Sequence, residues 1–405
     1  MKFNSFILAI ETSCDETAIA LLSATQIQND NPTSVIPPLA ESRQNSWSGD
    51  ILSHKIQSQI EIHRPFGGVF PNMAKREHIR NILPLIKETL ETLEEMDDFY
   101  GVTIHLSDEQ KQYIIETCKH EDGFADMLIE FIQTTPKPSL TYIAITTGPG
   151  LMPALWVGVN TAKVLGMIWN IPVRPVNHMM GHLLSVQSTL SAFTLTPHTI
   201  PSVALLVSGG HTEIIAITEH GYEKIGKTLD DALGESFDKA ARMLGLPYPG
   251  GPEIGKLAQE YIETQPNIIS DNVFPRPMKT TVGYDVSYSG LKTSVKYYIE
   301  KNPTVDHSYI AYEFQEAALE TILYKLFLYL QSHDCEELIV AGGVAASPRL
   351  REKIQEGILK YGLNCKVSFP VGILATDNAV MIGVASLIAP DAVISDIVAQ
   401  GNMSL

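Results

Sequence analysis

Two histidines with helical spacing carry the strongest chemical signal in the chain. His178 and His182 lie in the run PVNHMMGHLL. On a helix, positions i and i+4 share one face, with β-carbons about 5–6 Å apart, so both imidazoles could bind one ion. An oxygen ligand is available from Asp377 in GILATDNAVMIG, with Thr376 as the expected N-cap of the following helix. Iron, zinc, manganese and magnesium all fit such a set.

The neighbours of the two histidines predict that the pair is partly buried. The residues between and after them are mostly apolar, and Gly181 would let another backbone approach closely. Two ordinary surface or core histidines are the alternative for an isolated HxxxH pattern. The glutamate of an HExxH motif is absent, so a metallopeptidase is disfavoured.

Small polar turns between apolar runs predict phosphate-binding loops. SGGH joins the runs VALLV and TEIIAI over residues 203–217, and ETSCDE joins two such runs over residues 6–23. GPG after residues 142–147 and AGG within residues 336–343 each precede an expected helix. A helix N-terminus after such a turn favours an anion, although a plain βα turn explains any single case.

The two hairpin patterns lie about half the chain apart and indicate an internal duplication. We therefore expect an α/β fold with two similar domains, residues 1–175 and 176–405, facing each other across a nucleotide cleft. The end of the second domain is expected to pack back on the first. The acidic segment 90–138 is expected to be a mainly helical insertion. Helices are expected at 76–95, 153–169, 231–245, 252–263, 309–333, 347–360 and 376–388.

Composition limits the partners and the compartment. The chain has 405 residues and a net charge of 29 − 46 = −17, so nucleic-acid binding would need a local basic cluster. Lys75, Arg76 and Arg80 are the strongest candidates for such a cluster. No apolar run is long enough to span a bilayer, and the four cysteines form no CxxC pair, which favours a reducing compartment.

Nine stretches together resemble the TsaD family of tRNA N6-adenosine threonylcarbamoyltransferases, from about Ile7 to Gly383. They are IETSCDET, GGVFPNMAKREHIRNILPLI, TTGPGL, NHMMGH, LVSGGHTEI, DDALGESFDKAARMLGLPYPGG, SYSGLKTSV, AGGVAASPRLR and TDNAVMIG. The resemblance implies the fold shared by acetate and sugar kinases, heat-shock ATPases and actin (ASKHA), which agrees with the duplicated hairpins.

The resemblance also implies site residues. The family's metal ligands correspond to His178, His182 and Asp377, and its acidic pair to Asp15 and Glu16, for which we expect a catalytic role. Its substrate-binding residues correspond to Leu206, Val207, Ser208, Gly209, Gly210, Asp238, Gly251, Gly255 and Ser347. Ser347 replaces an asparagine of the family, so that contact differs here.

The implied reaction moves the threonylcarbamoyl group of threonylcarbamoyl-AMP to the N6 amine of the adenosine beside the anticodon, in tRNAs that read ANN codons, and releases AMP. A Sua5/TsaC-like enzyme would supply the adenylate, and each subunit would hold one divalent metal ion. The 90–138 insertion resembles that of a mitochondrial (Qri7-type) member, which predicts a homodimer in the mitochondrial matrix, with the cytoplasm as the other compartment. An ASKHA-type small-molecule kinase or ATPase is the main alternative.

Overall fold

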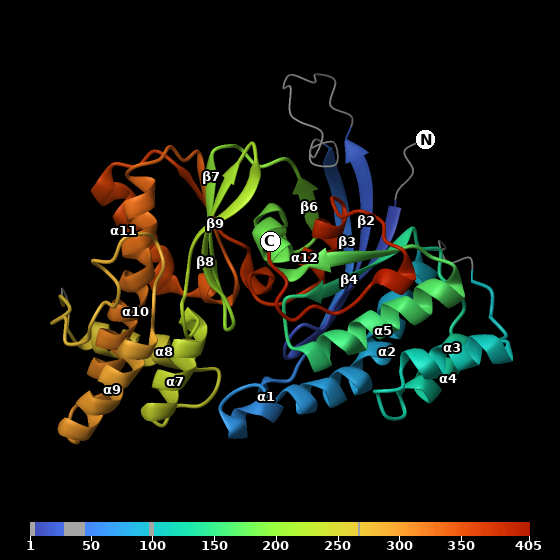
Figure 1. Cartoon of the computed structure of the whole chain (residues 1–405), viewed down its shortest axis with the longest axis horizontal. Coiled ribbons are helices and arrows are strands. Elements are labelled where there is room, and N and C mark those ends of the chain that lie inside the picture. Colours follow the sequence, from blue (N-terminus) through green and yellow to red (C-terminus); the bar gives the residue numbers. More distant parts are fainter. Residues whose placement is uncertain (1–4, 28–44, 97–100, 266–267) are drawn as a thin grey trace. The chain divides into compact units, whose positions relative to one another are not determined.

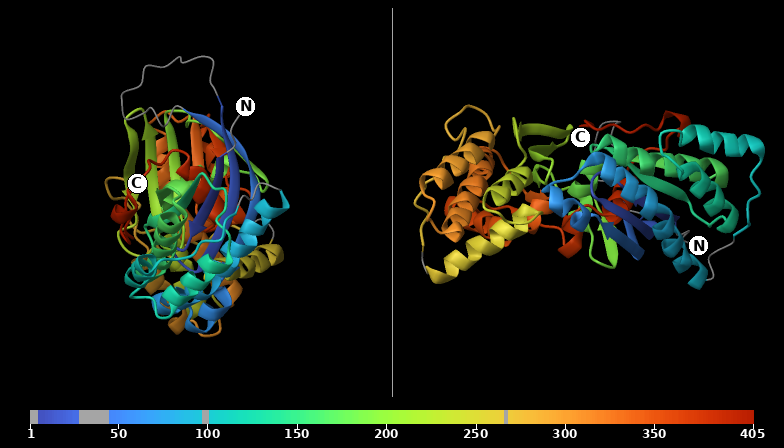
Figure 2. Two further views of the ribbon diagram at one scale, coloured as in Figure 1. Left: turned by 90° about the vertical axis from the view of Figure 1, so that its right-hand side faces the viewer. Right: turned by 90° about the horizontal axis from the view of Figure 1, so that it is seen from below.

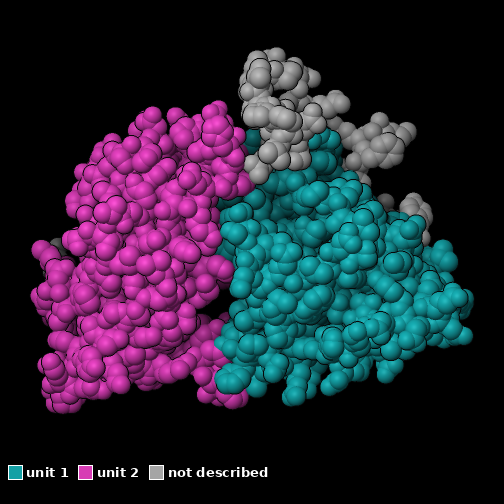
Figure 3. Space-filling view, in the orientation of Figure 1, with its two compact units in different colours: residues 1–59, 69–197, 377–405 teal, residues 60–68, 198–376 magenta. Residues whose placement is uncertain are grey.

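The computed structural model describes residues 5–27, 45–96, 101–265 and 268–405 (Figure 1). The chain forms two compact units (Figure 3). The first unit comprises residues 1–59, 69–197 and 377–405, and the second comprises residues 60–68 and 198–376. The expected domain boundary was at 175/176, whereas residues 176–197 lie in the first unit because they supply an edge strand of its sheet.

The sheet of the first unit has the strand order β5-β4-β1-β2-β3-β6. The strand β2 is antiparallel to its two neighbours, β1 and β3, and β4 and β5 continue parallel to β1. Ile7 pairs with Leu22 and Ile10 with Ile19, which confirms the first predicted hairpin. The strands are β1 (Ser5–Glu11), β2 (Glu16–Ile27), β3 (Ser46–Ser58), β4 (Tyr142–Gly148), β5 (Val173–Asn177) and β6 (Ala192–Leu195).

Helices of the first unit bury both faces of this sheet. Leu8 and Ile10 belong to a core cluster with residues of α2 and α5, which lie side by side (Figures 1 and 2). Ala9 and Leu22, with the opposite parity, contact Gly383 of α12. Burial on both faces explains the continuous apolar run of β1. The helices are α2 (Pro71–Glu95), α3 (Asp108–Thr117), α4 (Phe124–Thr134), α5 (Met152–Trp169), α6 (His178–Leu184) and α12 (Ala379–Ser386), with short 3-10 turns η3 (Ser185–Gln187) and η6 (Ile394–Asp396).

The second unit repeats the topology of the first five strands, with the order β11-β10-β7-β8-β9 and no counterpart of β6 in its sheet. Here β8 is antiparallel to its neighbours β7 and β9, and β10 and β11 continue parallel to β7. The strand β7 thus takes the place of β1, which confirms the predicted duplication. The strands are β7 (Ser202–Val207), β8 (Thr212–Thr218), β9 (Gly221–Lys227), β10 (Glu337–Ala341) and β11 (Lys366–Ser368).

The long helix α10 forms the centre of the second unit's core. It packs beside α8, and its apolar residues join those of β7 in one cluster (Figures 1 and 2). The helices are α1 (Ile60–His63), α7 (Leu233–Met243), α8 (Gly250–Thr264), α9 (Ser289–Lys301), α10 (His307–Leu330) and α11 (Pro348–Tyr361), with 3-10 turns η2 (Arg64–Phe66), η4 (Gly343–Ala346) and η5 (Gly372–Ala375).

The described part of the predicted insertion is helical, as expected, and residues 97–100 of it lie outside the described residues. The helix α3 begins with a capping box, in which Ser107 Oγ accepts the Gln110 N–H and Gln110 Oε1 accepts the Ser107 N–H. The prediction of Thr376 as an N-cap was wrong: Asn378 caps α12, and Thr376 donates instead to the Ile373 carbonyl. Among the described helices, none has the length and apolarity required to cross a membrane.

Candidate functional site

A short capped helix places the two histidines on one face. β5 ends at Asn177, whose Oδ1 accepts the N–H groups of Met179 and Met180 and so starts α6. One turn of α6 then separates His178 from His182, and their ring centroids lie 4.6 Å apart at an interplanar angle of 84°. Both side chains are buried, more completely than the sequence indicated.

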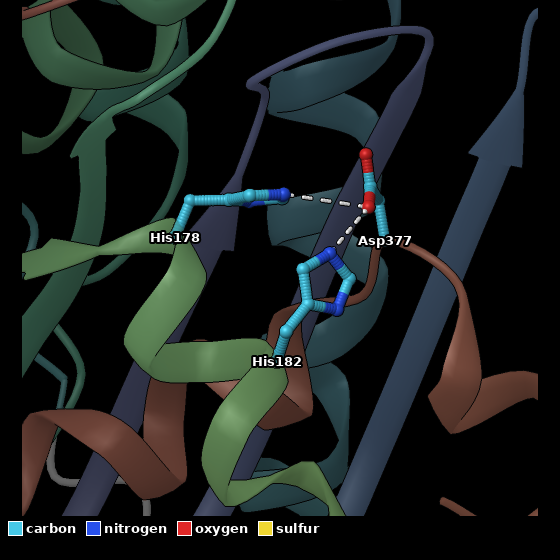
Figure 4. Close-up of side chains that lie close together, drawn as sticks. All are labelled: His178, His182 and Asp377. Atoms are coloured by element: carbon cyan, nitrogen blue, oxygen red, sulfur yellow. Dashed lines mark ion pairs between the residues drawn. The ribbon is translucent and has the colours of Figure 1, made fainter. Parts of the chain in front are cut away.

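The packing of α6 against α12 brings the acid to this pair. Gly181 allows the approach, because a Cβ at that position would lie only 3.0 Å from Met381 Cγ. Asp377 directly precedes the Asn378 cap of α12, so its side chain lies beside the histidines rather than in the helix. Its Oδ1 lies 3.1 Å from His182 Nε2 and 3.5 Å from His178 Nε2 (Figure 4).

These three side chains fit a divalent cation. Their ligand atoms all lie within 4.8 Å of one another. His182 Nδ1 is buried and makes no hydrogen bond with the described residues, whereas His182 Nε2 lies against the Asp377 carboxylate. Two imidazole nitrogens and one carboxylate oxygen that approach one another in this way form a donor set that suits a divalent cation. The Asp377 side chain is 20% exposed, so the ligand set is open on one side.

The charges of the site favour a cation. Burial alone would lower the pKa of His178, but Asp377 and Glu11 outweigh burial and raise it to about 10. Burial and the neighbouring His178 lower the pKa of His182. Burial would raise the pKa of Asp377, yet the two histidines hold it well below its usual range. Two carboxylates therefore stabilise positive charge here, and an ion can replace the proton on His178.

The turn between β1 and β2 places Asp15 and Glu16 in defined surroundings. The Asp15 carbonyl accepts the Gln59 N–H at 2.9 Å, and the Cys14 carbonyl lies 3.0 Å from His78 Nε2. Glu16 accepts a hydrogen bond from Ser58 Oγ at 3.2 Å. Burial, and then the charge of Asp15, raise the pKa of Glu16 well above its usual value. A glutamate with a raised pKa is a stronger general base than an exposed one.

The equivalent turn of the second unit, between β7 and β8, consists of Ser208, Gly209, Gly210 and His211. Ser208 Oγ accepts the N–H of Gly210 at 3.3 Å and that of His211 at 3.1 Å. Both glycines are exposed, and a Cβ on either would meet no atom within 4 Å. The predicted Leu206 and Val207 precede them as fully buried strand residues, so they can position this turn but present no side chain to solvent.

The glycine turn after β10 approaches the end of β7. Gly342 has a φ of +92°, and a Cβ there would lie 2.4 Å from the Val207 carbonyl oxygen, so only glycine lets η4 approach the end of β7. The turn η4 leads to Ser347, whose Oγ accepts the Leu350 N–H and caps α11. The serine that replaces the expected asparagine is therefore a helix cap.

Asp238 links two helices of the second unit. Its Oδ1 accepts the Gly250 N–H at 2.7 Å, which fixes the start of α8 against α7. Gly251 follows directly with open space beside it, and Gly255 lies one turn later, 3.6 Å from Gln315 Oε1 as measured from an added Cβ. The carboxylate thus holds the glycine-rich start of α8 in place.

The three basic candidates differ in their surroundings. Lys75 Nζ lies 3.1 Å from the buried Glu121 carboxylate and donates to the His120 carbonyl, so it ties α2 to the insertion. Arg80 pairs with Glu77 at 2.6 Å but leaves 71% of its side chain exposed. Arg76 is also exposed. The two arginines are accordingly more available to a phosphate than the lysine is.

Comparison with known proteins identifies the family. The model of the family "TsaD: tRNA N6-adenosine threonylcarbamoyltransferase" matches residues 50–98 and 120–384. A protein of that name from Thermosipho africanus is 37% identical, with 94% of this chain and 92% of the relative covered. One from Staphylococcus aureus is 36% identical, with 95% and 92% covered. The chain belongs to the TsaD family. Neither the kinase nor the metallopeptidase alternative is supported by these matches.

Solved structures of other proteins show weaker likeness to this TsaD family member. The activator of the 2-hydroxyisocaproyl-CoA dehydratase from Clostridium difficile with bound ADPNP has a TM-score of 0.44 and 7% identity, with 95% of this chain and 93% of that chain covered. Full-length HypF in its phosphate- and nucleotide-bound form has a TM-score of 0.43 and 13% identity. This comparison covers 65% of this chain and 49% of HypF. The family assignment rests on the sequence matches.

One residue of the site was missed from the sequence. Glu11 is fully buried beside His178, with 3.1 Å between Glu11 Oε2 and His178 Nδ1. The sequence did contain an indication of this residue: Glu11 is a charged residue directly after the apolar run FILAI, and charged residues are rarely buried without a partner.

Proposed function

We propose that this chain transfers the threonylcarbamoyl group of threonylcarbamoyl-AMP to the N6 amine of an adenosine in tRNA. The target is the adenosine beside the anticodon of tRNAs that read ANN codons. The new bond joins N6 to the carbamoyl carbon, the carbon–oxygen bond to the phosphate breaks, and AMP leaves. The observation that carries this proposal is a His-His-Asp donor set with both histidines buried, in a chain that matches the TsaD family over most of its length.

His178, His182 and Asp377 would hold one divalent metal ion, with iron, zinc, manganese and magnesium as candidates. When bound, such an ion supplies Lewis acidity toward a carbonyl or phosphoryl oxygen. The protein's own part is to fix the three ligands through the Asn177 and Asn378 caps and the contact at Gly181. This rigidity keeps the ligand atoms in place without the ion.

The N6 amine must lose a proton during transfer, and we assign the role of acceptor to Glu16 of the acidic pair. Its raised pKa makes it a more competent base than an ordinary surface carboxylate. Asp15 precedes it in the same turn, and its charge contributes to that raised pKa. A Glu16→Gln variant with full transfer activity would remove Glu16 from this role, and an Asp15→Asn variant tests the neighbour in the same way.

The adenylate would be held in the second unit. The exposed glycines of the Ser208–Gly210 turn suit phosphate oxygens, because a residue without a side chain lets its backbone approach an anion closely. Asp238 suits a ribose hydroxyl, since carboxylate oxygens accept hydrogen bonds from it. Gly251 and Gly255 leave room on the same face of α8, and Ser347 offers a hydroxyl near η4.

The partners follow from the same reaction. A Sua5/TsaC-like enzyme would supply threonylcarbamoyl-AMP, and the chain would act as a homodimer in the mitochondrial matrix. The resemblance of the 90–138 insertion to that of a mitochondrial member supports these two assignments. Light scattering of the purified protein tests the dimer, and imaging of the tagged protein in its native cells tests the compartment.

Arg76 and Arg80, with Lys75 behind them, would contact tRNA phosphates. The charge of −17 makes a local cluster necessary for this. Neutralising both arginines should reduce the slope of log affinity against log salt by about one to two. An unchanged slope would exclude them as phosphate contacts.

Reconstitution tests the whole proposal. Purified protein, a Sua5/TsaC-like enzyme, threonine, bicarbonate, ATP and unmodified tRNA are combined, and the tRNA is digested to nucleosides. We expect threonylcarbamoyladenosine at one site, and none when His182→Ala replaces the unaltered chain. Modified nucleoside formed equally well without this chain would contradict the proposal.

A further inference from the structure

A second carboxylate lies on the opposite edge of the His178 ring from Asp377. Glu11 Oε2 is 3.1 Å from Nδ1 of the ring, while the other nitrogen, Nε2, lies 3.5 Å from Asp377 Oδ1. The Glu11 side chain is fully buried. It belongs to none of the groups so far assigned to the ion, the adenylate or the proton.

Sheet topology places Glu11 at this position. β1, β4 and β5 are parallel neighbours, so their carboxyl ends meet at one edge of the sheet. Glu11 ends β1, Thr146 lies near the end of β4, and His178 directly follows β5. Three chain segments far apart in sequence thereby contribute one side chain each to the same spot.

Hydrogen bonds fix the orientation of the Glu11 carboxylate. Thr146 Oγ1 donates to Oε2 at 2.5 Å, and the Ser13 N–H donates to Oε1 at 2.5 Å. Both oxygens are therefore held independently of the histidine. A carboxylate anchored in this way presents a fixed acceptor to the Nδ1–H group of His178.

We propose that Glu11 is a positioning residue for His178, an inference that rests on the metal site of the proposed function. By accepting the Nδ1–H, Glu11 holds the imidazole in the tautomer whose Nε2 lone pair points toward Asp377 and a bound ion. Outer carboxylates of this kind orient a ligating histidine and strengthen its basicity. His182 has no such partner, since among the described residues its Nδ1 makes no hydrogen bond.

Ser13 is the competing candidate for this role, because its Oγ lies 3.2 Å from the same Nδ1. A hydroxyl can donate or accept, so it does not impose one tautomer on the ring. An ionised carboxylate accepts only, and therefore does. Replacing Ser13 by alanine should accordingly change metal affinity much less than replacing Glu11 by glutamine.

The test measures Zn²⁺ affinity of the full chain by competition with a chromophoric chelator, after the protein has been stripped of metal. Glu11→Gln should weaken Zn²⁺ binding about 10- to 100-fold. Thr146→Val, which keeps the carboxylate but removes one of its anchors, should weaken it less. Thermal unfolding of the metal-free proteins is recorded in parallel, because a purely structural role would lower stability without this loss of affinity.

Glu313 provides the matched control. It is also fully buried and accepts from Ser270 Oγ at 2.8 Å and from the N–H of Asp271 at 2.7 Å, but it lies in the second unit. Glu313→Gln should cost stability while leaving Zn²⁺ affinity unchanged.

Three results would overturn the inference. The first is a folded Glu11→Gln variant with Zn²⁺ affinity within about twofold of the unaltered chain, and the second is an equal loss in Glu313→Gln. The third, which decides if Glu11→Gln does not fold, is a folded Thr146→Val variant with unaltered affinity. Zn²⁺ binding that survives His182→Ala would instead refute the proposed metal site itself, and the inference with it.

Discussion

The two units share a sheet topology but differ at the turn that follows the first strand of each sheet. After β1, the turn ETSCDE carries acids and hydroxyls, with Glu11, Ser13 and Asp15 all buried. After β7, the turn SGGH has no acidic residue, and its two glycines are exposed. The first turn places carboxylates beside two histidines, whereas the second leaves glycine backbone exposed. In the proposed function, the duplicated fold would gain two different ligand preferences from the different chemistry of this one turn.

The largest expected effect is on metal content and transfer activity, when one proposed metal ligand of the first unit is removed. His182→Ala removes one of the three proposed ligands, all of which belong to the first unit, so metal content should fall from one ion per chain to nearly none. Transfer should fall on the order of 10³-fold, because several kcal/mol of charge stabilisation are lost. Ser208→Ala in the other turn should leave metal content unchanged. Elemental analysis and a transfer assay measure both, and retained metal in His182→Ala would break the distinction.

Acid should weaken the first unit through His54, which pairs with Ala20 in the sheet. Burial lowers the pKa of His54 to about 4. The folded state then resists protonation that the unfolded chain accepts near pH 6.5, so stability present above about pH 6.5 is lost as the pH falls toward 4. The loss should reach at most roughly 3 kcal/mol.

Denaturant titrations across that pH window check this expectation, with His54→Gln as the comparison. The variant lacks the titrating ring, so its stability should depend less on pH between about 4 and 6.5. Equal pH dependence of the two proteins would show that other groups cause the acid sensitivity.

Two glycines at the second turn should differ in their tolerance of a side chain. Gly234 of α7 packs against the turn, whereas Gly209 lies within it. A Cβ at Gly234 would lie 2.7 Å from the Ser208 carbonyl oxygen, so Gly234→Ala must displace the turn and should cost about 1–3 kcal/mol. Gly209→Ala meets no atom within 4 Å and should change stability by less than about 0.5 kcal/mol. If phosphate binds at the turn, both variants should bind AMP more weakly in calorimetry, with metal content unaltered.

Two substitutions of Ser347 should have the smallest effects, and they separate its contribution to stability from its contribution to AMP binding. Ser347→Ala removes the α11 cap and should cost roughly 1 kcal/mol of stability. Ser347→Asn keeps a capping side chain and restores the residue expected from the family resemblance, so stability should be retained and AMP affinity equal or higher. Lower AMP affinity in Ser347→Asn would argue that the serine contact is specific to this chain.

The convergence of His178, His182 and Asp377 was predictable from the sequence, but their surroundings were not. Helical spacing at His178 and His182 is a local property, and Gly181 marked the close helix contact correctly. The contact of Glu11 with His178 depends on which strands are parallel neighbours, and the periodicity of apolar residues in the sequence does not reveal strand order. The cap of α12 was misplaced because Thr376 and Asn378 are both good N-caps and only packing selects between them.

The fold shows the same limit. Apolar runs identified both hairpins and most helices, because burial leaves a pattern in the chain. The long strand β3 was missed: its sequence SWSGDILSHKIQS is largely polar, and pairing with β2 and β6 determines its structure. Residues 176–197 were expected in the second domain but belong to the first unit. The sequence did not reveal this, because the unit to which a segment belongs depends on long-range strand pairing rather than on local composition.

Anomalous diffraction from crystals grown with Zn²⁺ tests the central claim most directly. We predict one peak at the zinc edge, at roughly 2.0–2.2 Å from Nε2 of His178, Nε2 of His182 and a carboxylate oxygen of Asp377. No peak should appear at the SGGH turn of the second unit. An empty His-His-Asp site, or a zinc peak bound elsewhere in the chain, would contradict the account.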